Sequence, residues 1–425
     1  MALPQTHKAV VWRPPARDIR VEQVPIPKIE HPDDAIVKIQ LAGLCGSDLH
    51  VYRGDEDVHE PHVCGHELIG HVVALGSSFG PNAPRERPAL YATLKLGDKV
   101  VVPFTISCGE CEFCRRGFTA RCIKSCLLGQ PILPGGQAQY ARIPHAGGTL
   151  FALETLTNTG PALPDASLLL LADILPTGIF VALQALSHPK LAPALTGTAW
   201  PASASPALGA YFNDAVDARA AIVPADKTLQ IAVVGLGPVG LCALFALLDM
   251  LATLRAHYRV IGVDLNPARR AKAQAMYDIV AKAENMRGEF CVADGDEAKD
   301  VVKQWGRGGC HAVLEVVGHP SALSLSLALL GPVGIISSCG VHQAPAIPFT
   351  GRELYNANAT LEFGRCSVRA VFPAALRLLL KRRDIFGIIG DSGLVERVVG
   401  LDDAPEAYEK FNRGEWGKVV FDPWA

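Results

Sequence analysis

The sequence lacks a strong charge of either sign. Its 40 lysines and arginines nearly balance its 42 aspartates and glutamates, which gives a formal net charge of −2 over 425 residues. Nucleic-acid-binding proteins normally carry a basic face, so this balance argues against a nucleic-acid partner. The sequence also lacks an internal repeat and any long run of like charges. Its composition, 49% hydrophobic and 19% charged, is typical of a globular protein of two or three domains.

An uninterrupted membrane-spanning segment is missing as well. Residues 229–248 are apolar and uncharged, and the run is long enough to cross a bilayer. Three glycines and a proline interrupt its first half, so a buried strand, a glycine turn and a helix explain it better. The N-terminal residues have no apolar core of the signal-peptide type. We therefore expect a cytoplasmic protein with no membrane partner.

The twelve cysteines show no disulfide framework. Eight of them are scattered, and free thiols suit a reducing compartment. The other four lie within fifteen residues with the spacing C-x2-C-x2-C-x7-C, as Cys108, Cys111, Cys114 and Cys122. Short gaps let consecutive thiolates reach one ion, and four cysteines with no open position describe a structural zinc site. A disulfide pair, unrelated core cysteines and an iron–sulfur cluster are the alternatives.

The first 150 residues contain short alternating runs, such as DAIVKIQLAG and KLGDKVVVPF, which predict β-strands joined by glycine and proline turns. Residues 163–187 predict a mostly helical connector that Pro176 breaks. Two stretches fit neither pattern. Residues 188–227 are rich in alanine, proline and serine, and residues 81–89 are rich in proline and arginine. Both predict surface insertions.

From residue 229 to residue 341, apolar strands alternate with helices, as in LQIAVVG, RVIGVDL, HAVLEVVG and VGIISSCGV. This alternation predicts a doubly wound parallel α/β sheet. The C-terminal tail predicts a strand near 360–366, a helix near 370–383 and a final strand near 418–422. The chain is therefore expected to combine a β-rich part with a parallel α/β part.

A glycine-rich motif follows the first of these parallel strands and opens a helix. The first glycine permits a tight turn, the second lets the backbone approach a pyrophosphate, and the third lets the helix pack on the strand. The helix N-terminus then faces the phosphates. The motif predicts a dinucleotide site made by Gly235, Gly237, Pro238, Val239 and Gly240.

The next strand ends at Asp264, 24 residues after Gly240 and close to the separation expected for a ribose-binding carboxylate. Such a carboxylate accepts hydrogen bonds from both ribose hydroxyls and repels a 2′-phosphate, which favours NAD over NADP. Arg269 and Arg270 lie just beyond and would tolerate a phosphate. Alternatively, Asp264 caps the strand end and the two arginines are solvated helix charges.

Two further segments carry metal-ligand chemistry: Cys45-Gly-Ser47-Asp48-Leu-His50, and Gly65-His66-Glu67. A catalytic zinc needs three protein ligands and one open position, and Cys45 and His66 are good candidates. These motifs, followed in order by the four-cysteine loop, D-I-L-P-T-G, G-L-G-P-V-G and a strand ending in aspartate, resemble the zinc-containing medium-chain dehydrogenase/reductase family. The likeness is to its alcohol and polyol dehydrogenase group and covers nearly the whole chain.

The resemblance implies a third ligand for the catalytic zinc. In this family it lies four residues before a Thr-Gly pair that contacts the nicotinamide. Here the pair is Thr177-Gly178, so the implied ligand is Asp173. A thiolate and a carboxylate together still neutralise Zn²⁺. A plain reading remains for Asp173, as a cap that ends a helix.

The resemblance also implies roles for the residues around the zinc. Glu67 corresponds to a glutamate behind the metal, either as an outer group or as an alternative ligand. Asp48 corresponds to the carboxylate that orients the ligand histidine. Ser47 and His50 correspond to a proton relay from the substrate hydroxyl to solvent. The plain alternatives are that Ser47 caps a turn and that His50 is a surface histidine.

By this resemblance the chain has a GroES-like β-barrel-type catalytic domain, residues 1–176 and 346–425, and a Rossmann domain, residues 177–345. It implies a zinc-dependent oxidoreductase that transfers hydride between an alcohol and NAD, with two zinc ions per subunit, in a homodimer or homotetramer. The apolar insertion at 188–227 favours a secondary or bulky alcohol. The alternatives are non-redox or NAD-recycling chemistry on a specialised metabolite, and a non-catalytic binding protein.

Overall fold

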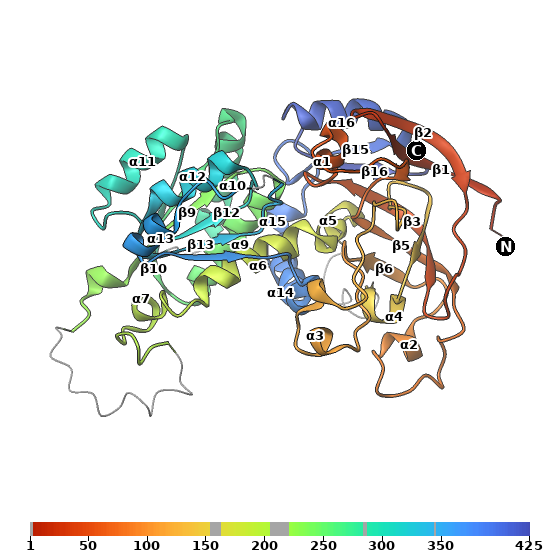
Figure 1. The fold of residues 1–425 in the computed structure, drawn as a ribbon, viewed down its shortest axis with the longest axis horizontal. Coiled ribbons are helices and arrows are strands. Elements are labelled where there is room, and N and C mark those ends of the chain that lie inside the picture. The colour runs from red at the N-terminus through yellow and green to blue at the C-terminus, as the bar shows by residue number, and fades with distance from the viewer. Residues whose placement is uncertain (1–2, 154–162, 205–220, 284–286, 344–345) are drawn as a thin grey trace. The chain divides into compact units, whose positions relative to one another are not determined.

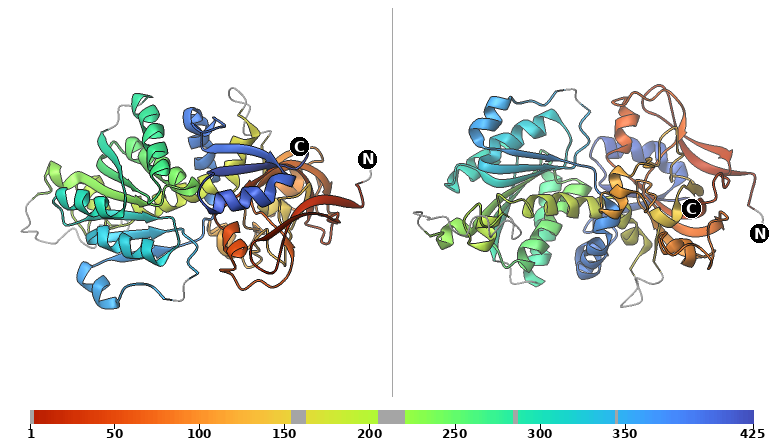
Figure 2. Two further views of the ribbon diagram at one scale, coloured as in Figure 1. Left: turned by 90° about the horizontal axis from the view of Figure 1, so that it is seen from above. Right: turned by 60° about the horizontal axis from the view of Figure 1, so that its bottom comes forward.

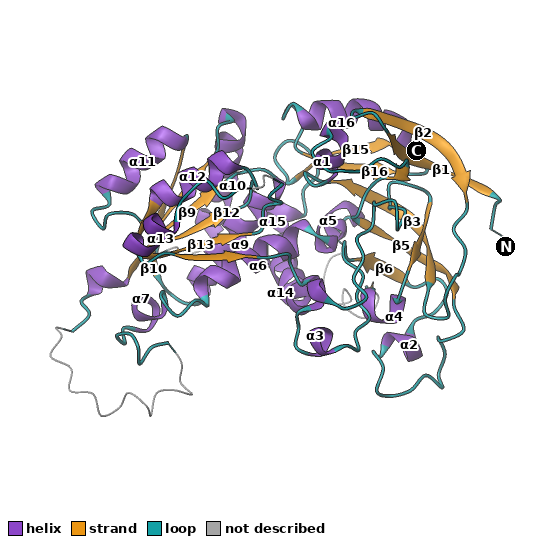
Figure 3. Cartoon of the chain, in the orientation of Figure 1, coloured by secondary structure: helices purple, strands orange, loops and turns teal. Residues whose placement is uncertain are grey.

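The computed structural model describes residues 3–153, 163–204, 221–283, 287–343 and 346–425. The chain divides into two compact units (Figure 1). Unit 1 comprises residues 1–176 and 366–425, and unit 2 comprises residues 177–365. Unit 1 is rich in strands, whereas helices and strands alternate in unit 2 (Figure 3).

Unit 1 is built on a seven-stranded sheet in the order β15-β16-β3-β5-β6-β8, with β7 also paired to β3, and on a three-stranded sheet β2-β1-β4. The central strand β3 is buried along almost all of its length because β16, β5 and β7 pair with it. The strands are β1 Thr6–Arg13, β2 Asp18–Pro25, β3 Ala35–Leu44, β4 His62–Val63, β5 Leu68–Leu75, β6 Lys99–Val102, β7 Tyr140–Ile143, β8 Phe151–Ala152, β15 Val395–Gly400 and β16 Lys418–Asp422.

The helices of unit 1 are short, apart from α14, and lie mostly in the connections between strands. They are α1 Asp48–Arg53, α2 Leu90–Thr93, α3 Glu112–Arg115, α4 Ala146–Thr149, α5 Asp165–Leu169, α14 Val368–Lys381, α15 Arg383–Phe386 and α16 Ala404–Asn412. The last of these packs on the β1–β16 side of the unit, where Tyr408 and Phe411 join a buried apolar cluster.

Unit 2 is a parallel six-stranded sheet in the order β11-β10-β9-β12-β13-β14, with helices on both faces (Figure 2). This doubly wound order reverses between β9 and β12, where open α/β sheets bind ligands. The strands are β9 Thr228–Val234, β10 His257–Val263, β11 Gly288–Ala293, β12 Cys310–Glu315, β13 Leu330–Ser338 and β14 Thr360–Phe363. The helices are α6 Ile174–Leu186, α7 Ala192–Thr196, α9 Pro238–Thr253, α10 Pro267–Ala283, α11 Gly295–Gln304, α12 Pro320–Leu329 and α13 Gly351–Ala357.

The apolar run 229–248 forms β9, the glycine turn and the buried part of α9. Among the described residues, no single helix is long and apolar enough to cross a membrane. The helical pair Asp165–Ala172 and Ile174–Leu186, bent by 47°, reaches the required length and apolarity only when the two are taken together.

We had expected the helical connector to break at Pro176, but it breaks at Asp173. The residues before Asp173 form α5 and a 3-10 turn, Asp173 itself has φ −150° and ψ −72°, and α6 begins at Ile174. Pro176 therefore lies in the first turn of α6, where its missing N–H leaves no helical acceptor without a donor. The break turns an aspartate, which would otherwise sit in a buried apolar helix, into the residue between two helices.

The boundary between the units differs from the expected position at residue 345. Strand β14 pairs in parallel with β13, from Ile335↔Thr360 to Ser338↔Phe363. Residues as far as Arg365 therefore belong to unit 2. The β/α alternation continues for one more strand. This strand is so short and polar that its sequence did not indicate to which sheet it belongs.

The insertion predicted at 188–227 is described only in part, because residues 205–220 lie outside the described residues. Its described portions include α7 and the 3-10 turn Pro224–Lys227, which contact each other just before β9 begins. They therefore lie at the amino end of β9, whereas the glycine motif lies at its carboxyl end. The expectation of a bulky substrate drew on this insertion, and its described portions do not support it.

The insertion at 81–89 joins β3 to the four-cysteine loop. The Arg87 guanidinium donates to both carboxylate oxygens of Asp33 at 3.1 and 2.8 Å, and to Glu110 Oε1 at 2.5 Å. It also lies 3.6 Å from the ring centroid of Tyr91. Asp33 precedes β3, and Glu110 lies between Cys108 and Cys111. Arg87 of the insertion thus links the cysteine loop to the segment before β3.

We expect Arg87→Ala to lower the free energy of unfolding by about 2–4 kcal/mol at neutral pH, because it removes the guanidinium that pairs with the buried Asp33 carboxylate. Burial raises the pKa of Asp33, but Arg87 outweighs burial and holds that pKa well below the ordinary value. The stabilisation is therefore present above about pH 4 and is lost as the pH falls further. Denaturant unfolding from pH 7 to pH 3 measures both effects.

The exposed neighbour Arg85 provides the control, and Arg85→Ala should match the parent protein. If the Arg87→Ala variant loses as much stability in acid as the parent does, the ion pair between Arg87 and Asp33 does not cause the loss of stability in acid.

Candidate metal and nucleotide sites

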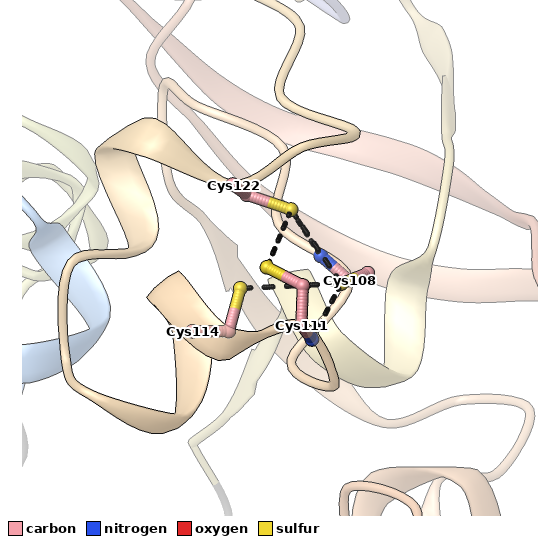
Figure 4. Close-up of side chains that lie close together, drawn as sticks. All are labelled: Cys108, Cys111, Cys114 and Cys122. Atoms are coloured by element: carbon pink, nitrogen blue, oxygen red, sulfur yellow. Dashed lines mark hydrogen bonds between the residues drawn. The ribbon is translucent and has the colours of Figure 1, made fainter.

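The four clustered cysteines surround one point in the loop that contains α3. Their sulfur atoms face one another (Figure 4). The sulfur of Cys108 lies 4.0 Å from that of Cys114 and 3.5 Å from that of Cys122, and Cys111 lies 3.9 Å from Cys122. Four thiolates arranged tetrahedrally about 2.3 Å from a zinc ion would be roughly 3.8 Å apart. The separations therefore fit a closed four-sulfur site.

Backbone donors support thiolates at this site. The N–H groups of Glu110 and Cys111 point to the Cys108 sulfur at 3.4 and 3.3 Å, and that of Lys124 points to the Cys122 sulfur at 3.3 Å. All four cysteines are free of disulfide bonds. The disulfide alternative is therefore wrong, whereas zinc and an iron–sulfur cluster both remain compatible with four thiolates.

A second group of donors is buried where β3 and β5 end side by side. Cys45 follows β3 and His66 precedes β5, and the antiparallel pairing of Ala42 with Leu68 brings these two ends together. Asp173 arrives from the helical break. The donor atoms of Cys45, His66, Glu67 and Asp173 all lie within 4.8 Å of one another.

The separations in this second group also fit a metal ion. The Cys45 sulfur lies 3.6 Å from Asp173 Oδ2, and His66 Nε2 lies 3.3 Å from the same oxygen. Tetrahedral zinc with one sulfur, one nitrogen and one oxygen ligand would place these pairs about 3.5 and 3.3 Å apart. Three donors from separate segments thus converge at metal-ligand spacing and leave a fourth position for another group.

The electrostatics of the group call for a cation. Burial raises the pKa of the Cys45 thiol, and the carboxylates of Asp173 and Glu67 raise it further. Lys418 supplies a positive charge from the fully buried side, and it pairs with Glu67. A metal-bound Cys45 would be a thiolate, and together with the Asp173 carboxylate it would carry two negative charges, which is the charge that a divalent ion neutralises. The donor set therefore fits zinc.

Glu67 is held behind the other donors. Its Oε2 pairs with Lys418 Nζ, which also donates to the Leu44 carbonyl at 3.0 Å. Its Oε1 is buried and has no hydrogen-bond partner. A Cβ on Gly43 would lie only 1.9 Å from Glu67 Oε2, so only glycine leaves room for this carboxylate. Glu67 is thus a buried carboxylate with one oxygen unsatisfied beside the metal donors.

Asp48 fixes the orientation of His66. Its Oδ1 lies 3.0 Å from His66 Nδ1, and its Oδ2 accepts from the Cys45 N–H at 3.0 Å. Because a carboxylate only accepts, His66 donates from Nδ1 to Asp48, and Nε2, which lies 3.3 Å from Asp173 Oδ2, is the atom that would bind a metal ion.

Ser47 and His50 lie at the start of α1, three residues apart on one face of the helix. No hydrogen bond joins their side chains in the described part of the chain. The carboxylate of Asp55, a partly exposed residue, places its Oδ2 3.6 Å from His50 Nδ1. The structure therefore places both residues beside the donor group without connecting them.

The glycine motif joins β9 to α9. Gly235 has φ +96°, and a Cβ on Gly240 would lie 1.8 Å from the Gly235 carbonyl oxygen, so turn geometry and close packing require these two glycines. Around Gly237, the nearest atom to a Cβ would be Arg269 Nη1 at 3.7 Å. Gly237 therefore brings no side chain of its own to the N-terminus of α9, which begins at Pro238 with Val239 next, and the Arg269 guanidinium lies beside it. A helix N-terminus with a guanidinium nearby suits a phosphate.

Asp264 lies at the end of β10 beside this loop. Its Oδ2 accepts from the Leu236 N–H at 2.7 Å, and its Oδ1 accepts from the Asn266 N–H at 2.8 Å. Arg269 Nη1 lies 3.7 Å from Asp264 Oδ2. The Arg270 guanidinium donates to the carbonyl oxygens of Asp264 and Leu265, which occupies donors that would otherwise meet a 2′-phosphate.

The Thr177-Gly178 pair lies in the first half of α6. Thr177 is buried, with 8% of its surface exposed. A Cβ on Gly178 would lie 2.5 Å from the Ala243 nitrogen in α9, so this glycine serves helix packing inside unit 2.

Sequence reasoning missed Lys418, although one signal was present. A lysine opens the apolar terminal strand, and β16 pairs with β3 so that Val419 lies opposite Leu44. Lys418 is thereby brought to the end of β3 that carries Cys45. It also missed two exposed apolar residues beside the glycine loop, Leu265 with 83% and Val317 with 46% of their surfaces exposed.

We expect Lys418→Met to lower the free energy of unfolding by about 3–5 kcal/mol, because it leaves the Glu67 charge buried and unpaired. Adding Glu67→Gln removes that charge, so the double variant should recover much of the loss. Denaturant unfolding of the two single variants and the double variant measures the coupling between them. Additive effects would contradict the ion pair.

Comparison with known proteins agrees with this geometry. Residues 31–153 match the alcohol dehydrogenase GroES-like domain family, and residues 238–381 match the zinc-binding dehydrogenase family. The chain is 35% identical over 415 residues to zinc-type alcohol dehydrogenase B of Aspergillus flavus, covering 97% of this chain and 81% of that one. It is 34% identical over 353 residues to the medium chain reductase/dehydrogenase ucsI of Acremonium sp., covering 83% of this chain and 99% of that one.

Solved structures show the same architecture. The alcohol dehydrogenase TADH from Thermus sp. ATN1 superimposes with a TM-score of 0.70 at 28% identity, covering 98% of this chain and 99% of that one. The match therefore extends over both units, including the segments that carry the two groups of metal donors and the glycine motif. On these grounds the chain belongs to the zinc-containing medium-chain dehydrogenase/reductase family, with a GroES-like domain and a Rossmann domain.

Proposed function

We propose that this protein is an alcohol dehydrogenase that uses NAD and two zinc ions per chain, one catalytic and one structural. The observation that carries the proposal is the buried set of Cys45, His66 and Asp173, because its donor separations suit a tetrahedral ion with one free position. Its substrates are alcohols, secondary or bulky ones included, and the corresponding ketones or aldehydes. We propose a homodimer or a homotetramer as the working assembly.

The three donors and the four-cysteine loop have different tasks. Cys45, His66 and Asp173 would hold a catalytic zinc, which when bound polarises the oxygen of the substrate. Cys108, Cys111, Cys114 and Cys122 would hold a zinc that fixes the loop. Glu67, paired with Lys418 and with Oε1 unsatisfied, stays close enough to serve as an outer group or an alternative ligand.

Ser47 and His50 would move the proton of the substrate hydroxyl. Ser47 lies two residues after Cys45, directly before α1, and its hydroxyl could accept that proton. His50 follows on the same helical face, and Asp55, partly exposed, lies 3.6 Å beyond its ring. A hydroxyl, an imidazole and a partly exposed carboxylate in sequence lead outward to water.

The glycine motif and Asp264 would bind NAD, which when bound accepts or donates the hydride. The N-terminus of α9 would meet the pyrophosphate, and the Asp264 carboxylate would accept from the ribose hydroxyls. Leu265 follows Asp264, and Val317 lies against Gly235, so both present apolar surface beside the loop. The two faces of adenine would rest on such surfaces. Thr177 would contact the nicotinamide end.

We expect Asp173→Ala to reduce the zinc content from two ions to one per chain and to lower the rate of NADH formation by more than roughly 100-fold, because several kcal/mol of polarisation are lost. Asp173→Cys keeps an anionic ligand and should retain two ions. Metal analysis and NADH absorbance, with a panel of primary, secondary, polyol and bulky alcohols, measure both effects. Full turnover by the Asp173→Ala variant would contradict the site.

We expect Asp264→Ser to lower kcat/KM for NAD by roughly 10- to 100-fold, because each charged hydrogen bond to the ribose contributes about 1.5–3 kcal/mol. The value for NADP should stay level or rise, since the negative charge that repels the 2′-phosphate is gone. Steady-state kinetics with each cofactor measure the ratio. Arg270→Ala is the control and should leave the preference for NAD in place, while an unchanged ratio for Asp264→Ser would overturn the assignment.

A further inference from the structure

Three polar side chains are buried together in unit 1 and have no role in the function proposed above. Tyr408 of α16 has 1% of its surface exposed, Gln137 has none exposed, and Cys64 has 5% exposed. Cys64 and Tyr408 belong to an otherwise apolar cluster. Buried polar groups are unfavourable unless they are hydrogen-bonded, so their contacts call for an explanation.

Two of these side chains, Tyr408 and Gln137, belong to a continuous hydrogen-bonded chain that ends at a metal donor. The Tyr408 hydroxyl donates to Gln137 Oε1 at 2.8 Å. Gln137 Nε2 donates to the Gly43 carbonyl at 3.0 Å and to Asp48 Oδ2 at 3.4 Å. Asp48 Oδ1 then accepts from His66 Nδ1 at 3.0 Å. The chain thus runs from Tyr408 through Gln137 and Asp48 to the imidazole of His66, and the Gly43 carbonyl is a side branch.

The donors and acceptors of this chain can be assigned in only one way. The Gly43 carbonyl only accepts, so the Gln137 amide must turn its Nε2 towards it. Gln137 Oε1 then faces Tyr408, whose hydroxyl must donate. Burial raises the pKa of Tyr408 well above its ordinary value, so the phenol keeps its proton. The chain therefore has a fixed direction, from the phenol to the Asp48 carboxylate.

Gln137 also holds the segment that carries His66. Its N–H donates to the Cys64 carbonyl at 2.9 Å, and the N–H of Gly136 donates to the Gly65 carbonyl at 2.9 Å. A Cβ on Gly65 would lie 2.5 Å from Gln137 Cγ, which shows how closely the two segments approach. The main chain of Gln137 thus bonds to the segment before His66, and its side chain bonds to residues on both sides of Cys45.

We propose that Gln137 and Tyr408 are positioning residues for the metal ligand His66, acting through Asp48. Three N–H donors converge on the Asp48 carboxylate, from Cys45, Gln137 and His66. They fix its plane, and its plane fixes the tilt and tautomer of the imidazole. This inference rests on the proposed catalytic zinc site and extends it by one shell beyond Asp48.

The test compares Tyr408→Phe with Tyr52→Phe. Tyr52 is also buried, with 6% of its surface exposed, and its ring centroid lies 5.4 Å from that of Tyr408, but its hydroxyl is outside the chain described above. Each holoenzyme variant is treated with a chelator, and the release of the two metals is followed over time. The catalytic site is also loaded with Co²⁺, whose visible absorption reports ligand geometry. The metal in the four-cysteine loop serves as an internal standard for folding.

We expect Tyr408→Phe to release the catalytic metal roughly 3- to 10-fold faster and to shift the Co²⁺ absorption, with release from the four-cysteine loop unchanged. Loss of a direct partner of a metal ligand typically changes metal affinity by roughly 10- to 100-fold. The effect of Tyr408→Phe should be smaller, because Gln137 separates Tyr408 from Asp48, the direct partner of His66. Gln137→Met, which removes all three hydrogen bonds of the side-chain amide at similar volume, should have the larger effect. Tyr52→Phe should match the parent enzyme in both measurements.

Two outcomes overturn the proposal, and they are distinguishable. If Tyr408→Phe and Gln137→Met release the catalytic metal at the parent rate with an unchanged Co²⁺ spectrum, the positioning role fails while the proposed function stands. If the parent enzyme binds no metal at Cys45, His66 and Asp173, the proposed function and the positioning role fail together.

Discussion

Unit 1 is organised by the need to compensate negative charge that is buried at the end of β3. Cys45, Asp173 and Glu67 bring a thiol and two carboxylates within a few ångströms of one another. Such charges are strongly unfavourable in a protein interior unless they are paired or bind a metal. Lys418 compensates the charge of the Glu67 carboxylate. A divalent ion would compensate the charges of the Asp173 carboxylate and of a deprotonated Cys45. The ends of β3, β5 and β16 and the break before α6 all meet at this point because each contributes one of the charges.

The same constraint explains features that have no obvious connection with metal binding. Gly43 is a glycine because Glu67 occupies the space of its Cβ. Asp48 is held by the Cys45 backbone and by Gln137, so the donor group, the strand end and α16 share one hydrogen-bonded network. In unit 2 the corresponding constraint is the reversal of strand order between β9 and β12, which leaves the glycine loop and Asp264 at the carboxyl edge of the sheet.

The sequence predicted the features that depend on short spacing. The cysteine spacing, the glycine motif after an apolar strand and the alternation in residues 229–341 each describe local geometry, and the structure has four facing sulfurs, a glycine turn and a parallel sheet. Features that depend on distant pairing were not predictable. Lys418 reaches Glu67 only through the β16–β3 pairing. Tyr408 reaches Gln137 only because α16 packs against the apolar cluster formed by β1 and β16. The break at Asp173 was placed at Pro176 because proline is a strong local signal, whereas the burial of an aspartate is a tertiary one.

X-ray absorption at the zinc edge of the purified protein tests the central claim most directly. Four thiolates at one ion and one thiolate at the other predict roughly five sulfur neighbours near 2.3 Å and three nitrogen or oxygen neighbours near 2.0–2.1 Å, summed over two ions per chain. That mixed shell is the predicted result. A shell of sulfur alone, or an iron edge in place of the zinc edge, would show that the buried group at Cys45, His66 and Asp173 holds no zinc and would contradict the account.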